Sequence, residues 1–163
     1  MEFFPPPDQT QVFFELTLAM ILGLLLGAER SIAGKSAGMR TYALVAMGSC
    51  LFVLISVFVS SNNFNNFNFD PLRVAAGIVT GVGFLGAGLI VLQKSHLHGL
   101  TTAAGLWVAS AVGVAVGFGL HIIAIFTTFL TLVVFTIMWF VEVKVKTFSP
   151  TNQPENKPEQ DHS

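Results

Sequence analysis

The chain has 163 residues, of which 53% are hydrophobic and only 10% are charged, whereas soluble domains have about 25% charged residues. A single soluble domain of this length would have too little polar surface to cover such a core. The net charge of −1 gives no indication of nucleic-acid binding. The composition therefore predicts a membrane protein.

The apolar segments predict an all-α membrane protein, a bundle of about five transmembrane helices. Crossing the hydrocarbon core takes about 20 apolar residues, and the period-two alternation of strands is missing. The predicted spans are Val12–Ala28, Tyr42–Ser60, Leu72–Leu92, Leu100–Phe118 and Leu120–Phe140. We expect residues 1–147 to form one transmembrane domain and the polar residues 148–163 to form a disordered tail.

The positions of the basic residues predict the orientation of the chain. Seven of the eight lie in the loop after the first span, in the loop after the third span or in the C-terminal segment, and only Arg73 lies elsewhere. Loops rich in Lys and Arg stay in the cytoplasm. The sequence therefore predicts an external N-terminus and a cytoplasmic C-terminus.

Charged residues stand at both ends of the first span. Glu29 and Arg30 end this span, and Arg40 follows in the loop. A basic cytoplasmic loop explains the arginines, and an ion pair with Arg30 or Arg40 is the simplest explanation of Glu29. Glu15, one turn inside the span, is compatible with an end residue that reaches the surface or with a polar group that faces the bundle.

The third span opens with Asp70-Pro71, and Arg73 follows. Asp is a favourable N-cap and Pro fits the first helical position, so a cap with a local ion pair to Arg73 is the structural interpretation. In the functional interpretation, Asp70 is a cation ligand or a gate at the outer face, because ionisable groups at membrane depth are often functional. Arg73 shares a helix face with glycines and is predicted to point into the bundle.

Glycines four residues apart lie on one helix face and let helices approach closely in a bilayer. Such pairs occur in three of the predicted spans, and one more glycine extends the face in the third span. The predicted packing residues are Gly23, Gly27, Gly77, Gly81, Gly88, Gly113 and Gly117. They indicate either packing within one chain or an interface between copies in a homo-oligomer.

No set of nucleophile, base and acid indicates an enzyme, and no cofactor site is predicted. Mg²⁺ prefers carboxylate oxygens, which leaves Asp70 as the one candidate metal ligand. Glu29 is expected at the opposite face, about 25–30 Å away, too far to share an ion with Asp70. His96 and His98 lie in a short loop without a third ligand and are expected to be solvated.

Several sequence blocks resemble the MgtC/SapB family in order and spacing. They are Gly27–Arg30, Gly34–Thr41, Asp70–Ala76, Gly81–Gly88 and Gly99–Trp107. Glu29, Arg40, Asp70 and Arg73 occupy the charged motif positions of that family. Gly77 stands where many members have Gln, and Ser31 where many have a charge. The chain is similar to the short, SapB-like form, which lacks the soluble C-terminal domain of the MgtC branch.

The resemblance implies a multi-pass protein of the bacterial inner membrane with a role in Mg²⁺ homeostasis, in acid tolerance and, in pathogens, in survival in host cells. It implies that the protein regulates or partners another membrane protein, as the best-studied branch does with the proton-driven ATP synthase. The alternative is a transporter of Mg²⁺ or small solutes that uses Asp70 and Arg73 at a glycine-lined helix. The expected partners are the lipid bilayer, further copies of the chain and another membrane protein, with no nucleic acid.

Overall fold

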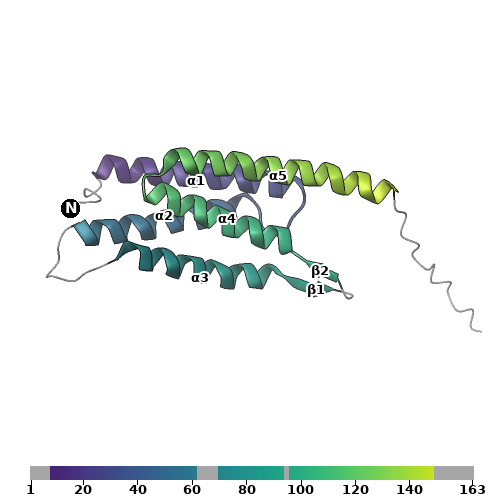
Figure 1. The fold of residues 1–163 in the computed structure, drawn as a ribbon, viewed down its shortest axis with the longest axis horizontal. Helices are drawn as coiled ribbons and strands as arrows, with labels where there is room; N and C mark the ends of the chain where they lie inside the picture. Colours follow the sequence, from purple (N-terminus) through teal and green to yellow (C-terminus); the bar gives the residue numbers. More distant parts are fainter. Residues whose placement is uncertain (1–7, 62–69, 94–95, 149–163) are drawn as a thin grey trace, which may run out of the picture.

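The computed structural model describes residues 8–61, 70–93 and 96–148, which form five helices and a β-hairpin (Figure 1). In chain order the elements are α1 (Gln9–Ile32), α2 (Met39–Ser61), α3 (Pro71–Leu89), β1 (Val91–Gln93), β2 (His96–His98), α4 (Leu100–Gly117) and α5 (His121–Phe148). All five helices are long and apolar enough to cross a membrane. The prediction of an all-α bundle of about five transmembrane helices is confirmed.

The sequence prediction is wrong about the connection between α3 and α4, because it continues the third span to Leu92. The helix ends at Leu89, and the chain then turns into an antiparallel hairpin in which Val91 pairs with His98. Gly99 follows with φ of 90°, a conformation that side chains disfavour. A Cβ at Gly99 would also lie only 3.0 Å from the carbonyl carbon of Leu89.

The last helix also differs from its predicted bounds. α5 continues to Phe148, beyond the predicted end at Phe140. Residues 149–163 of the predicted polar tail lie outside the described residues.

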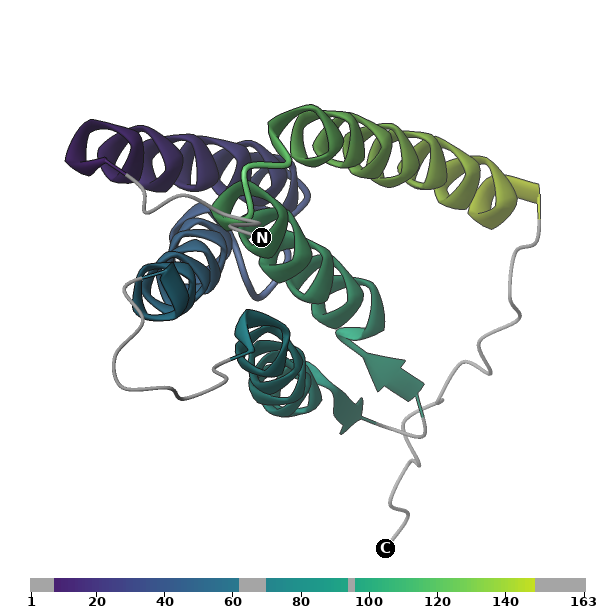
Figure 2. The same cartoon turned by 60° about the vertical axis from the view of Figure 1, so that its left-hand side comes forward.

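α4 is the central helix of the bundle. It contacts each of the other four helices, and Figure 2 shows it between α1, α2, α3 and α5. In its span, 56% of the residues are buried, against 11% in the span of α3. α3 contacts α2 and α4 along one side only, so most of its surface is exposed in a single chain.

α1 and α4 both pack closely against the backbone of α2 through glycines. A Cβ on Gly23 or Gly27 of α1 would lie 2.7 or 2.6 Å from backbone atoms of α2. On α4, a Cβ at Gly113 would lie 2.8 Å from the carbonyl carbon of Ala46, and one at Gly117 would lie 2.8 Å from a side chain of α2. Real Cβ atoms do not come this close to their neighbours, so these four positions have room only for glycine.

The glycines of α3 are different. A Cβ on Gly77, Gly81 or Gly88 would meet nothing within 4 Å. Of the two interpretations of the glycine pairs, packing within one chain is therefore wrong for these three glycines, and an interface with another chain stays a prediction. Arg73 is exposed as well, and the prediction that it points into the bundle is wrong in the same sense.

Two buried polar contacts join α2 to α4 beside the glycines. The hydroxyl groups of Ser49 and Ser110 lie 2.8 Å apart, and the Tyr42 hydroxyl donates to the carbonyl of Thr102 at 3.0 Å. All four residues are buried. Interhelical hydrogen bonds of this kind contribute about 0.6 kcal/mol on average in a membrane, so they support the packing and fix its register.

We predict that Gly113→Ala destabilises the bundle, whereas Gly83→Ala does not. The added methyl at position 113 meets the α2 backbone, which cannot move aside cheaply, and overpacking typically costs about 1–3 kcal/mol. Gly83 has open space around its Cβ position, and an exposed helical Gly→Ala change stabilises by up to about 1 kcal/mol. Thermal unfolding of both purified variants in detergent checks this. Equal transition temperatures for the two variants would contradict the packing described here.

Candidate functional site

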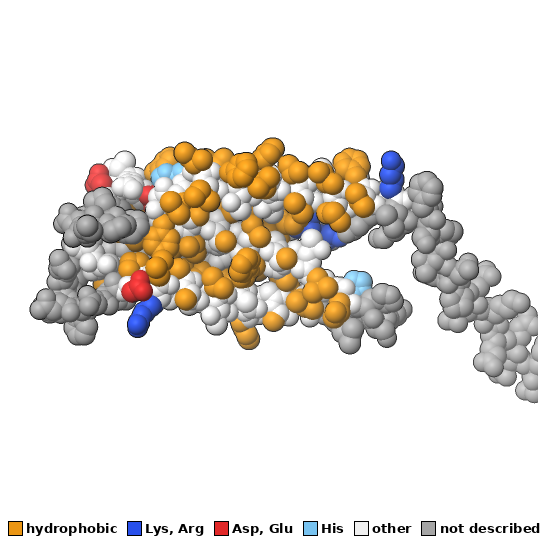
Figure 3. Space-filling view, in the orientation of Figure 1, with side chains coloured by type: hydrophobic (Ala, Val, Ile, Leu, Met, Phe, Trp, Pro, Cys, Tyr) orange, Lys and Arg blue, Asp and Glu red, His pale blue; other side chains and the backbone are white. Residues whose placement is uncertain are grey.

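The charged residues singled out in the sequence lie at two ends of the bundle. α1 and α3 begin at the same end in Figure 1, so Asp70, the N-cap of α3, lies at the end opposite to Glu29 in the last turns of α1. α3 has 19 residues, a length of about 28 Å. On the face shown in Figure 3, hydrophobic side chains cover most of the length between the charged groups. The structure therefore does not bring Glu29 and Asp70 together.

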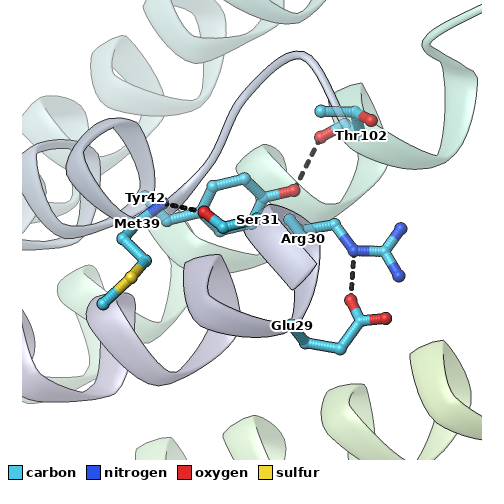
Figure 4. Close-up of polar contacts among 6 residues, drawn as sticks. All are labelled: Glu29, Arg30, Ser31, Met39, Tyr42 and Thr102. Atoms are coloured by element: carbon cyan, nitrogen blue, oxygen red, sulfur yellow. Dashed lines mark hydrogen bonds and ion pairs between the residues drawn. The ribbon is translucent and has the colours of Figure 1, made fainter. Parts of the chain in front are cut away.

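At the end formed by the last turn of α1, Arg30 is held by two partners. Its Nε donates to the carboxylate of Glu29 in an ion pair (Figure 4). The guanidinium carbon lies 3.7 Å from the ring centroid of Phe135 in α5, a cation–π arrangement. Arg30 is only 3% exposed. Of the two partners considered for Glu29, the structure selects Arg30, and Arg40 is exposed outside this pair.

The loop that follows α1 is fixed to the first turn of α2. The Met39 N–H donates to the Ser31 hydroxyl at 3.1 Å (Figure 4). Ser31, the position that departs from the family pattern, therefore has a structural contact of its own.

At the other end of the bundle, Asp70 caps the N-terminus of α3. Its carboxylate accepts a hydrogen bond from the Leu72 N–H at 2.9 Å, with Pro71 in the first turn. Both Asp70 and Arg73 are exposed, and the structure records no ion pair between them. Within the described ranges, no group of three or more His, Cys, Asp or Glu residues could hold a metal ion. The cap interpretation accounts for Asp70 without a bound cation.

A pair that the sequence analysis missed, buried Glu15 and half-buried His121, lies near the start of α1 and α5. Glu15 is 1% exposed, and its Oε1 accepts from the Gln11 side chain at 2.9 Å and lies 3.8 Å from Nε2 of His121. In the part of the chain that the structure describes, Glu15 Oε2 and His121 Nε2 have no hydrogen-bond partner. Glu15 therefore faces the bundle. The topology held a signal for this pair, because odd-numbered spans all begin on the same side.

A groove runs between α2 and α3. Its volume is about 600 Å³, and its eleven lining residues include Gly48, Gly77, Gly81 and Ser49 but no charged residue. The open glycine face of α3 forms one of its walls. The sequence could not reveal this groove. Gly48 belongs to no glycine pair, and the distance between two helices has no signature in the sequence of either helix.

The comparisons with known proteins identify the family of the chain. Residues 16–144 match the model of the MgtC family. The chain belongs to the MgtC family. No solved structure matched it.

Relatives include proteins from three bacteria. The chain is 41% identical over 126 residues to a protein of Escherichia coli K12 named "Putative magnesium transporter YhiD", an alignment that covers 76% of this chain and 59% of that protein. It is 39% identical to protein SrpB of Synechococcus elongatus, over 80% of this chain and 76% of SrpB. It is 46% identical to protein MgtC of Salmonella typhimurium, over 64% of this chain and 42% of MgtC. The chain thus spans roughly half the length of YhiD and MgtC.

We predict that His121 and Glu15 are energetically coupled. His121→Ala removes the imidazole that lies beside the buried Glu15 carboxyl group and is expected to destabilise the protein by about 1 kcal/mol. In a Glu15→Gln background the same change costs less, with a coupling energy of about 0.5 kcal/mol or more. Unfolding of the four proteins in detergent, arranged as a double-mutant cycle, measures the difference. Additive effects of the two changes would contradict the coupling.

Proposed function

We propose that this protein acts in Mg²⁺ homeostasis in the bacterial inner membrane by binding a helix of another membrane protein. Membership of the MgtC family and the name of the E. coli relative support the link to magnesium. The open face of α3 supports the mode of action.

The groove between α2 and α3 is the observation that carries this proposal. Its lining has no charged residue, is largely apolar and includes glycines from both helices. Lipid tails are as apolar as leucine, so an apolar surface alone does not attract a helix in a bilayer. Small residues do, because they let a second backbone approach and gain van der Waals contact. A transmembrane helix of the partner is therefore the proposed occupant.

A second copy of the chain fits the groove less well. A symmetric dimer presents the same surface from both partners, so two grooves would meet hollow to hollow and stay partly unfilled. A single helix of a different protein presents a convex surface to the groove instead.

The placement of the charges also favours a regulator over a transporter. Asp70 and Glu29 lie at opposite ends, Asp70 caps α3, and no charged residue lines the groove. An ion path needs polar ligands at membrane depth. The alternative is transport of Mg²⁺ or a small solute with Asp70 and Arg73. It requires further polar ligands at membrane depth, and the lining of the groove has no charged residue to supply them.

We predict that a photo-cross-linking amino acid at Ile78, in the groove, captures one specific membrane protein in cells grown at low Mg²⁺. The same probe at Phe129, which is 60% exposed on α5, serves as the control. Gly81→Leu places a bulky side chain in the groove and should reduce the Ile78 adduct by about tenfold, equivalent to about 1.4 kcal/mol of binding. Gly83→Ala should leave it unchanged. Mass spectrometry identifies the adduct.

Three results would contradict the proposal. One is an adduct with a second copy of the chain only, and another is equal adducts at Ile78 and Phe129. The third is Mg²⁺ flux into proteoliposomes that Asp70→Asn abolishes, which would favour the transporter.

We further propose that the N-terminus is outside and the C-terminus is cytoplasmic, on the basis of the basic loops. A cysteine at Lys35 should react with a membrane-impermeant maleimide only after the cells are broken, and one at Leu120 should react in intact cells. Both positions are exposed, and the native Cys50 is fully buried, so it gives no background labelling. Labelling of position 35 in intact cells would reverse the orientation.

A further inference from the structure

A small cavity lies where the end of α1, the first turn of α4 and α5 meet. Its volume is about 50 Å³, while a single water needs only about 10–15 Å³. Two basic residues, Arg30 and Lys35, line it together with Thr101, and residues of α5 form its apolar wall. The cavity is large enough for several waters or for one tetrahedral oxyanion.

Arg30 presents unused hydrogen-bond donors here. A guanidinium carries five N–H donors, and the ion pair with Glu29 is made through Nε. Figure 4 shows the contact with Glu29 made by Nε, which leaves the two terminal nitrogens outside this hydrogen bond. Phe135 covers one face of the group and holds it in place. A planar, oriented guanidinium of this kind suits an oxyanion.

The end of α1 places the second cation beside the first. Gly34 adopts φ of 65°, and the Lys35 N–H donates to the carbonyl of Arg30 at 3.0 Å. This is the Schellman arrangement that ends many helices. The backbone of Lys35 is thus fixed to that of Arg30, and both line the cavity. Counting Glu29, the three side chains carry one net positive charge.

The first turn of α4 adds to the positive potential. Thr101 lies in this turn, and the N-cap Gly99 supplies no side-chain hydrogen bond to it. The free N–H groups and the helix dipole at an N-terminus favour anions. Cationic side chains and a helix N-terminus therefore converge on one cavity.

We propose that this cavity binds the phosphate of an anionic lipid headgroup. The apolar wall decides between a lipid and free phosphate, which share the same chemistry. Val134 and Met138 line the cavity and are 56% and 48% exposed, so an acyl chain can lie along α5 while the phosphate meets Arg30 and Lys35. Basic pockets between transmembrane helices at the cytoplasmic side bind anionic headgroups. The groove at α3 takes no part in this site.

Native mass spectrometry of the full chain, delipidated in detergent, tests the site. Phosphatidylglycerol should bind about tenfold more tightly than zwitterionic phosphatidylcholine. Lys35→Ala should weaken phosphatidylglycerol binding about fivefold, because each basic residue near an anionic headgroup contributes about that factor. Thr101→Val, which removes only the hydroxyl group, should weaken it about threefold. Lys144→Ala removes an exposed positive charge from α5 outside the cavity and should have no effect.

The outcomes separate the sources of the phosphate. Inorganic phosphate at millimolar concentration should not displace phosphatidylglycerol. If inorganic phosphate binds with the same dependence on Lys35 and phosphatidylglycerol shows no preference over phosphatidylcholine, the lipid assignment is overturned. Equal losses for Lys35→Ala and Lys144→Ala would show only general attraction to a charged end, and would overturn the site.

Discussion

The close approach of α1 and α4 to the backbone of α2 is the constraint on which the rest of the bundle depends. Four glycines, Gly23, Gly27, Gly113 and Gly117, leave no side chain between these helices. Since lipid removes most of the hydrophobic driving force between helices, such close contacts supply the association energy. Hydrogen bonds between buried side chains of α2 and α4 then set their register. The three helices form the most closely packed part of the bundle.

The same glycine spacing serves a different purpose in α3. Gly77 and Gly81 are four residues apart, as Gly113 and Gly117 are, yet their faces meet nothing in the single chain. Glycine in an exposed helix position costs about 1 kcal/mol relative to alanine in helix propensity. For Gly77 and Gly81, no close helix contact inside the monomer offsets this cost. A helix that docks from outside would recover it through close contact. This contrast between two identical spacings is the physical basis for placing a partner at α3.

The sequence predicted the parts of the fold that depend on local chemistry. Span length gave the number of helices, and Asp70-Pro71 gave the start of α3 because a cap is decided within four residues. The Glu29–Arg30 pair is local in the same way. The end of α3 was less accessible, because Ile90, Val91 and Leu92 are apolar enough to continue a helix. Pairing with His96–His98 makes Val91 and Leu92 extended instead, and Ile90 becomes the C-cap of α3.

The neighbour that each helix face contacts was not predictable from the sequence. In a soluble helix the polar face identifies the solvent side, but in a bilayer both the lipid-facing and the buried sides are apolar. A glycine pair therefore defines a face without naming its neighbour. This is why the sequence left open, for every pair, whether it packs within the chain or between copies. The pairs of α1 and α4 contact α2, whereas the pair of α3 contacts nothing in the single chain. The expectation that Arg73 points into the bundle depended on the same unassigned face of α3. Glu15 needed knowledge of its neighbour, His121, which is 106 positions away in the chain.

The distribution of ionisable groups argues for a protein that acts at its two membrane-surface ends and through its lipid-facing side, with no ion path through its middle. Between Glu15 and Glu29, α1 carries no Asp, Glu, Lys or Arg, and α4 carries none over its full length. The groups at the ends have structural or local partners: Glu15 lies beside His121, Asp70 caps α3, and Glu29 pairs with Arg30. A dehydrated Mg²⁺ ion demands several oxygen ligands at short range, and the middle of this bundle offers hydroxyl groups that already bond to one another. What the chain offers instead is one helix face for a neighbouring helix and a cationic cavity at the end of α1.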